Sequence, residues 1–379
     1  MAEQGSPRTF RRRFHFQESG LVLVILVLGF FLTFFGGSVP TPVFRVNDQG
    51  ERERVFKLNE KGEREPVLVQ RSKFFNPKSL TQLGKDTSFI AIMAVGATFV
   101  IISGGIDLSV GSIYALASVL AAMVFHYYGP DGAKPNASPW ASVPLGLLTC
   151  VGVATICGVL NGGMIVALRV HPFIITLGTM AIFRGIAFVA TKGQSIGGFP
   201  EAFRAIVRWE AVQELTLVPM LVMVLVAIVG GIYLSRLAAG RRIYAIGGNE
   251  LASRFSGIQV ERVKLSVYIF SGLTAGIAAL LSLGYYGGAT SGDAQGYELN
   301  VIAAAVVGGA SLSGGKGSAL GALLGALVIQ MISTGIIILG IDQNYSQIII
   351  GGVVILAVVL DQVNSWLGKR RLAARAGSP

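Results

Sequence analysis

Three charged side chains interrupt stretches that are otherwise apolar, and chemistry on an ion or a polar solute would depend on them. Asp107 lies in the glycine-rich turn GGIDLS, Arg184 lies within GTMAIFRGIAFVA, and Glu298 opens a short apolar run. A charge that faces lipid is costly, so each of these side chains must face a cavity, a charged partner or a helix end. They are therefore candidates for a pathway across a membrane.

Each of these charges has a structural explanation beside the functional one. Asp107 would cap a helix that starts at Leu108, or it would line a gate together with Ser109. Arg184 needs an acceptor, either Asp107, Glu298 or the carbonyls of a helix end, unless its side chain reaches the outer lipid headgroups. Glu298 would complement the dipole at the start of its own helix.

The stretch GGASLSGGKGS looks like a phosphate-binding loop but does not satisfy its pattern. The pattern needs Ser or Thr after the lysine and Gly at its first position, whereas Gly317 follows Lys316 here and Ala310 stands first. The chain therefore has no evident nucleotide site of its own. Gly317, Gly321 and Gly325 instead form a repeated small-residue face, which predicts close helix packing.

The composition is that of a chain that crosses a membrane many times. Of 379 residues, 52% are hydrophobic and only 13% are charged, and 50 are glycine. The net charge of +11 lies mostly at the ends of apolar runs and in loops, which membrane topology explains better than nucleic-acid binding. Cys150 and Cys157 share one apolar run and the histidines lack ligand spacing, so we expect no disulfide, metal or cofactor.

A basic loop at residues 236–264 is predicted to contain a short helix. Asn249 can cap its N-terminus, Glu250 stands in its first turn, and Gly257 follows its last turn as a left-handed stop. Clustered Arg and Lys beside membrane spans mark the cytoplasmic side, so this helix should face the cytoplasm.

The same helix carries an apolar stripe. Leu251 and Phe255 lie four residues apart and therefore share one side of the helix, with Arg254 among the basic residues around them. The stripe belongs either to a plain solvated loop helix or to an element that docks a cytoplasmic partner.

Apolar runs predict an all-α polytopic membrane protein of about ten transmembrane helices. The runs lie near 21–37, 89–103, 110–127, 143–160, 173–190, 216–235, 265–285, 299–312, 318–339 and 346–361. Two of them, 89–103 and 299–312, are too short to cross roughly 30 Å of hydrocarbon as straight helices, and short glycine-broken segments are typical of a transporter's binding path. Basic residues place the tails 1–20 and 363–379 in the cytoplasm, if the first run is not a cleaved signal peptide.

An insert at residues 38–80 precedes the core at residues 81–362 and departs from its pattern. RVNDQGERERVF at 45–56 is followed at once by KLNEKGEREPVL at 57–68, a tandem repeat of twelve residues. Each copy has a turn tetrad flanked by alternating apolar and charged residues, which predicts two small β-hairpins or a meander. We expect this insert outside the membrane, over the outer mouth, where its charges would steer a docking partner.

Four stretches resemble one family, in the family's order. GRRIYAIGGNELASRFSGIQVERVKLSVYIFSGLTAGIAALL resembles the cytoplasmic loop and next span of monosaccharide ABC-importer permeases of the ribose/xylose type, in the branched-chain amino acid/sugar permease superfamily. AVGATFVIISGGIDLSVGSIYALA, VHPFIITLGTMAIFRGIA and GYELNVIAAAVVGGASLSGGKGSALGALL resemble the same family. That family commonly has an acid where this chain has Asn300, which we add to the pathway candidates.

The resemblance implies a function and partners. In this family the short loop helix docks on an ATPase subunit, a role that would fall here to Asn249, Glu250, Leu251, Arg254, Phe255 and Gly257. The chain would be a permease subunit, not an enzyme, that moves a pentose, hexose or cyclitol across a bacterial inner membrane by alternating access. Its partners would be the ATPase that hydrolyses ATP, an extracytoplasmic sugar-binding protein and a second permease copy, as a homodimer.

Two other classes remain open from the residues alone. An ion-coupled secondary transporter or channel would use Asp107 or Glu298 to carry a coupling ion. A membrane scaffold or receptor would explain the charged insert but not the glycine breaks within the membrane. The capped cytoplasmic helix discriminates, because neither of these classes needs one.

Overall fold

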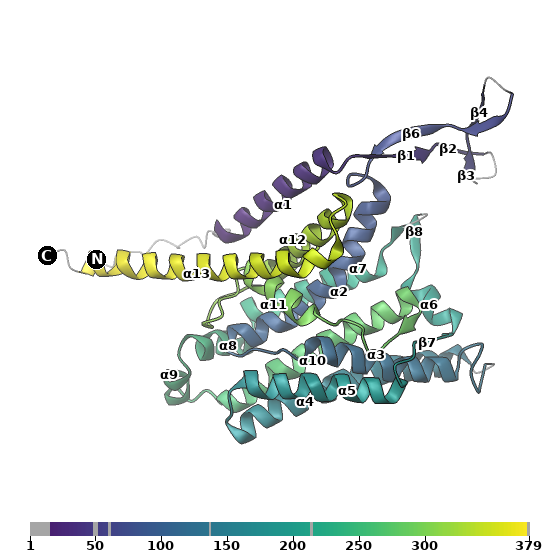
Figure 1. The fold of residues 1–379 in the computed structure, drawn as a ribbon. Helices are drawn as coiled ribbons and strands as arrows, with labels where there is room; N and C mark the ends of the chain where they lie inside the picture. Colours follow the sequence, from purple (N-terminus) through teal and green to yellow (C-terminus); the bar gives the residue numbers. More distant parts are fainter. Residues whose placement is uncertain (1–15, 48–51, 60–61, 136–137, 213–214, 377–379) are drawn as a thin grey trace, which may run out of the picture.

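The computed structural model describes residues 16–47, 52–59, 62–135, 138–212 and 215–376, and it is built mainly of α-helices (Figure 1). The helices are α1 (Phe16–Phe35), α2 (Pro77–Ile102), α3 (Val110–Tyr127), α4 (Pro139–Leu168), α5 (Pro172–Thr191), α6 (Glu201–Val207), α7 (Val218–Arg236), α8 (Ala238–Gly248), α9 (Glu250–Phe255), α10 (Val260–Tyr286), α11 (Tyr297–Val307), α12 (Ala319–Ile338) and α13 (Ser346–Ala376). The strands are β1 (Ser38–Pro42), β2 (Phe44–Val46), β3 (Arg52–Arg54), β4 (Phe56–Leu58), β5 (Arg64–Pro66), β6 (Leu68–Ser72), β7 (Ile196–Gly197), β8 (Glu210–Val212), β9 (Leu215–Thr216) and β10 (Gly288–Ala289).

The helices confirm the expected polytopic class. Eight of the described helices are long and apolar enough to cross a membrane, and two further apolar segments, α11 and Gln343–Val359, are shorter. The run at 299–312 is indeed short, since α11 has only 11 residues. The prediction that the run at 89–103 is too short was wrong, because α2 extends back to Pro77 and has 26 residues.

The core of the bundle is built around α2. Of the most apolar stretch of each helix, 94% is buried in α2, against 72% in α3 and α10 and 11% in α1. Small residues allow this packing: a methyl group at Gly96 of α2 would collide with the Thr274 side chain of α10, and one at Gly158 of α4 would crowd Tyr268 and Ile269. Helices α2, α3 and α10 therefore form the interior, while α1 stays at the edge.

The insert folds around a ring of three backbone hydrogen bonds, which we call the valine ring. The N–H of Val55 donates to Val43 O at 2.9 Å, that of Val67 to Val55 O at 2.8 Å, and that of Val43 to Val67 O at 2.9 Å. Three antiparallel strand pairs leave this ring: β2 with β3, β4 with β5, and β1 with β6. The two expected hairpins are present, and their turns at 48–51 and 60–61 lie outside the described residues.

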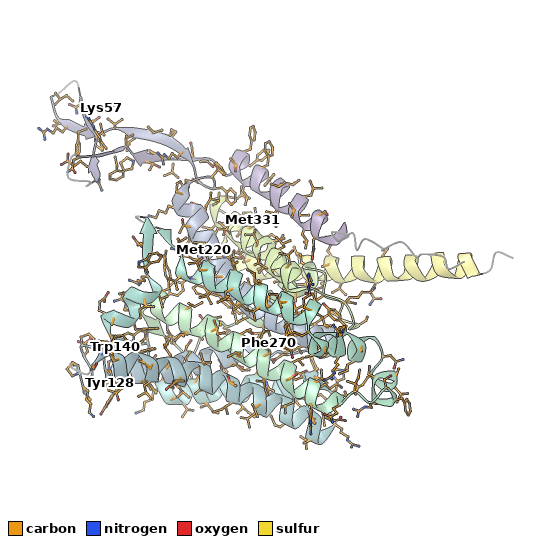
Figure 2. The ribbon with its side chains drawn as sticks, turned by 180° about the vertical axis from the view of Figure 1, so that it is seen from behind. Lys57, Tyr128, Trp140, Met220, Phe270 and Met331 are labelled. Atoms are coloured by element: carbon orange, nitrogen blue, oxygen red, sulfur yellow. The ribbon has the colours of Figure 1, made fainter. Side chains whose placement is uncertain are left out.

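The loop helix α9 and the insert lie at opposite ends of the bundle (Figure 1). Strands β1 and β6 continue away from the helices beyond the end of α1. In Figure 2, Lys57 of the insert lies at the same end as Tyr128 and Trp140 but at the other edge. The insert therefore stands at the edge formed by α1. We expected it over the outer mouth, but it does not cover the middle of the bundle.

Candidate functional site

The loop helix α9 is closed at both ends by local hydrogen bonds. Asn249 Oδ1 accepts a hydrogen bond of 2.9 Å from a backbone N–H of the first turn. After the last turn, Ile258 N–H donates to Ser253 O and Gly257 N–H donates to Arg254 O. This two-bond pattern needs a left-handed residue, and Gly257 provides it with φ +80°.

Four paired charges fasten α9 to the start of α10, and we call them the charge clasp. Glu250 accepts hydrogen bonds from Arg254 at 3.0 Å and from Lys264 at 2.7 Å, and Arg254 also pairs with Glu261. Burial raises the pKa of Glu250, but the bonds from Lys264 and Arg254 outweigh it and hold that pKa below its usual value. The bond from Arg254 also lowers the pKa of Glu261. Each charged side chain of the clasp therefore has an oppositely charged partner within it.

The apolar stripe of α9 remains free. Leu251 is 65% exposed and Phe255 is 85% exposed, although both are large apolar side chains. Because the charges on α9 itself, Glu250 and Arg254, are already paired, burying these two side chains is the contact that α9 can still gain. An exposed apolar ridge rimmed by polar residues is typical of a protein interaction site.

The loop contains a second helix, α8, that we did not predict from the sequence, where we expected a single helix between 240 and 264. Its apolar residues Ile243 and Ile246 are buried, while Arg241 and Arg242 are exposed. Glycines hide this pattern in the sequence, since they make a poor helix interior in isolation. Helix α8 is therefore a packed element that leads directly into α9.

Helix α8 touches the end of α2, directly before the glycine-rich segment 103–109, and the second glycine-rich segment, 308–318. A methyl group at Gly247 would collide with Ile102 O, at the end of α2. Tyr244 Oη donates to Gly317 O at 2.7 Å. The second segment also meets the end of α2, since Gly315 N–H donates to Ile102 O at 2.9 Å. Helix α8 thus lies between α9 and the two segments that interrupt the bundle.

Asp107 is buried and bound by hydroxyl groups and one backbone amide. Its Oδ1 accepts from Ser109 N at 3.0 Å and Ser109 Oγ at 2.6 Å, and its Oδ2 accepts from Ser271 Oγ of α10 at 2.8 Å. Asn161 of α4 donates to Ser109 Oγ at 2.7 Å. These bonds tie the first glycine-rich segment to α4 and α10. Within the described parts of the chain, no lysine or arginine forms an ion pair with Asp107.

Arg184 is bound by backbone carbonyls and not by Asp107. One nitrogen of its guanidinium donates to Ser291 O at 2.9 Å and to Asp293 O at 2.6 Å. Both carbonyls belong to the loop between α10 and α11. The acceptors are thus loop carbonyls, and not Asp107, Glu298 or the helix-end carbonyls that we considered, and through them α5 holds this loop in place.

Glu298 and Asn300 lie on α11, and Glu298 faces the start of α3. A methyl group at Gly111 of α3 would collide with Glu298 Oε2. That oxygen is buried and makes no hydrogen bond within the described residues. The carboxylate therefore stands at the positive end of α3 as well as in the first turn of α11, which has Asn300 partly buried beside it.

The small-residue face of α12 lies against α11. A methyl group at Gly321 would collide with Gly308 O, and one at Gly325 with Ala304 O. The prediction that Gly317 belongs to this helical face was wrong, because it lies before α12 with φ +148°, a conformation that suits glycine. The short helix α11 is thus packed directly against the backbone of α12.

The candidate residues fall into two groups: those on the loop helix α9, and those around the glycine-rich segments that interrupt the bundle. Helix α8 lies between the two groups. Four of their partners were not singled out from the sequence: Asn161, Tyr244, Glu261 and Ser271. Asn161 and Ser271 are polar residues in apolar runs, the signal that marked Arg184. Glu261 and Lys264 are three residues apart at the start of α10 and so share one side of it.

Comparisons with known proteins agree on one family. The family described as "Branched-chain amino acid transport system / permease component" matches residues 80–358. The ribose import permease protein RbsC of Escherichia coli K12 is 38% identical over 292 residues, which covers 76% of this chain and 87% of that protein. The D-allose transport system permease protein AlsC of the same strain is 35% identical over 293 residues, covering 77% and 86%.

A third relative imports a different compound. The autoinducer 2 import system permease protein LsrD of Escherichia coli O9:H4 is 31% identical over 298 residues, covering 75% of this chain and 86% of that protein. No solved structure matches the chain. The matches confirm the resemblance of the four stretches, and this multi-pass membrane protein belongs to the family of branched-chain amino acid transport system permease components, among its sugar-importer permeases.

Proposed function

We propose that this chain is the membrane subunit of an ATP-driven importer that moves a monosaccharide (a pentose, hexose or cyclitol) across a bacterial inner membrane. The names of the ribose and allose permeases support a sugar as the solute. The end of the bundle that carries α9 would face the cytoplasm, with both tails, and the insert would face outward. A second copy of the chain would complete the pathway as a homodimer.

The observation that carries this proposal is the exposed ridge of Leu251 and Phe255 on the clasped helix α9. A groove on a separate ATPase subunit would bury the ridge. ATP binding in that subunit would then displace α9, and α8 would pass the displacement to both glycine-rich segments through Tyr244 and Gly247. The chain itself would do no covalent chemistry, because ATP only shifts the balance between inward-open and outward-open states.

The residues around the interruptions are the proposed pathway elements. Asp107 and Ser109 fix the first interruption, Arg184 fixes the loop ahead of α11, and Glu298 with Asn300 lies where α11 meets the start of α3. A neutral sugar needs hydrogen-bonding partners more than a net charge. We therefore expect Asp107 and Arg184 to position the moving segments, and Glu298 and Asn300 to lie nearer to the solute.

The proposal is tested by reconstituting the permease, its ATPase and its binding protein in proteoliposomes. Uptake of radiolabelled ribose, xylose, allose, glucose and inositol is measured with ATP on the ATPase side. We expect uptake of at least one of them that needs ATP and persists when ionophores abolish sodium and proton gradients. Uptake that follows such a gradient without ATP would instead favour the ion-coupled transporter.

A further inference from the structure

The valine ring gives the insert an approximate threefold symmetry. Val43, Val55 and Val67 are twelve residues apart, and each is followed at once by a strand. Phe44, Phe56 and Leu68 therefore occupy equivalent positions around the ring, although Leu68 belongs to the arm that returns to the membrane. All three are about half exposed, at 45%, 51% and 53%.

The strand register assigns the other side chains to one of two faces. Phe44 stands opposite Arg54, and Leu58 stands opposite Arg64. Residues opposite each other in an antiparallel pair project from the same side, as do residues two apart in a strand. The ring relates Phe44, Phe56 and Leu68 to one another, and the register adds Arg54, Leu58 and Arg64 to their side. We call this side of the insert, with Phe44, Arg54, Phe56, Leu58, Arg64 and Leu68, the arginine face.

On the opposite side basic residues stand across from acidic ones, and we call it the paired face. Arg45 stands opposite Glu53, and Lys57 stands opposite Glu65. Asn59 also donates to Glu63 and Glu65, each at 3.2 Å. The alternation of the strands places these carboxylates away from the arginine face. The arginine face is thus the one that offers apolar surface and positive charge together.

No described carboxylate forms an ion pair with Arg54 or Arg64. Both arginines are exposed, and Leu58 between them is 72% exposed. Apolar side chains flanked by unpaired arginines are the chemistry that binds an acidic, partly apolar protein surface, since arginine pairs with carboxylates in a bidentate manner.

The position of the insert favours a soluble partner over the lipid of its own membrane. The arm of β1 and β6 holds five residue pairs, which at 3.4 Å per residue extend about 17 Å. It points away from the bundle beyond the end of α1 (Figure 1). The arginine face is thus held beyond the headgroups, at the height of a protein seated on the outer end of the helices.

We propose that the arginine face is a docking surface for the soluble sugar-binding subunit, and that it contacts an acidic, partly apolar patch on the side of that protein. The proposal rests on the proposed function, which supplies a soluble partner at this end of the bundle. The contact brings the partner to the membrane and holds it there. It does not enter the sugar pathway, because the insert stands at the edge of the bundle.

Two matched double variants test the surface in the full permease–ATPase complex in nanodiscs. Arg54→Gln with Arg64→Gln removes two positive charges from the arginine face, and Arg45→Gln with Lys57→Gln removes two from the paired face. The probe is the purified binding protein of the same importer, and its Kd is measured at low and high salt. We expect the first pair to raise Kd about tenfold at low salt and less at high salt, and the second pair to change it less than about twofold.

A third variant, Phe44→Ser with Phe56→Ser, should raise the Kd of the binding protein by a similar factor. This increase should be the same at low and at high salt, because the lost contact is apolar. Its thermal unfolding in detergent and its membrane insertion serve as folding controls. Equal shifts in both charge variants would reduce the effect to net charge and overturn the proposal, as would unchanged Kd in all three. A shift that appears only when the nanodiscs contain phosphatidylglycerol would assign the face to anionic lipid instead.

This test can fail while the proposed function stands. ATP-dependent sugar uptake by the unaltered complex tests the function, whereas the difference between the two charge variants tests the docking surface. If uptake is normal and the two variants bind the partner equally, only the docking proposal is lost.

Discussion

The loop helix α9 and the insert are two small polar attachments at opposite ends of one apolar bundle, and they treat their charges differently. Around α9 the clasp pairs Glu250, Arg254, Glu261 and Lys264 with one another, so only an apolar ridge is left to a partner. In the insert, basic residues of one face stand across from acidic ones, whereas Arg54 and Arg64 on the other face have no ion pair among the described residues. The first arrangement suits a lasting hydrophobic contact, and the second suits a partner that arrives and leaves by electrostatic attraction.

The largest effect is expected from Phe255→Asp. A buried apolar anchor is worth about 2 kcal/mol or more, and a carboxylate would also be forced into the partner's groove. Uptake in proteoliposomes should fall at least about thirtyfold while ATP hydrolysis becomes independent of the permease. Ala252→Asp places the same charge beside the ridge and is the control, which should keep most of the uptake. Normal uptake by the Phe255 variant would end the assignment of α9 as the coupling element.

Deleting residues 41–70 with a short Gly/Ser bridge should have a smaller and different effect. The family match begins at residue 80, after the insert, so the core should fold and insert without it. Maximal uptake should persist, and the binding-protein concentration that gives half-maximal uptake should rise about tenfold, most clearly at low salt. Loss of membrane insertion would show that the core depends on the insert. Unchanged uptake at every binding-protein concentration would show that the insert does not dock the binding protein.

Glu250→Gln tests whether the clasp positions α9. The substitution removes two ion pairs at a partly exposed site, where such pairs are worth at most about 1 kcal/mol each. We expect the number of sugars moved per ATP to fall about threefold, with the affinity for the binding protein unchanged. Glu261→Gln removes only the second partner of Arg254 and should have less effect. A loss as severe as that of Phe255→Asp would mean that Glu250 itself contacts the ATPase.

The smallest effect concerns pH at the α9 end. Because the folded-state pKa of Glu250 lies below its usual 4.5, the clasp contributes its full stability above that pH and loses it as the pH falls through the lowered pKa. Hydrogen exchange of residues 249–264, corrected for intrinsic rates, should therefore stay constant from pH 8 to about 5 and quicken below. A change between pH 6 and 7 would contradict this assignment, because Glu250 stays ionised across that range.

The membrane spans and the caps of α9 were predictable because they depend on local composition. The full length of α2 was not, since polar residues occupy its first turns. There Lys85 Nζ donates to Tyr285 Oη, and Tyr286 Oη donates to Asp86 Oδ1 at 3.2 Å. These partners come from the far end of α10, and no local sequence pattern predicts them.

The partners of the membrane charges were equally hidden. Arg184 could be expected to need an acceptor, but its acceptors are the backbone carbonyls of Ser291 and Asp293, which carry no sequence signal. The prediction that Asp107 caps a helix starting at Leu108 was wrong, because α3 begins at Val110 with Ser109 at its N-cap, and the bond of Asp107 from Ser271 depends on how α10 packs. The ring of the insert was missed because two copies of the repeat are visible and the third position, Val43, precedes them.

The valine ring also bears on how such an appendage can arise. Its third arm is simply the chain entering along β1 and leaving along β6, so the two ends lie side by side, as in any ordinary hairpin. A gene duplication of one twelve-residue unit would complete the ring without changing the distance that the host loop must bridge. The unit is in this sense a self-contained graft, and we expect it to be transplantable into exposed hairpins of unrelated membrane proteins.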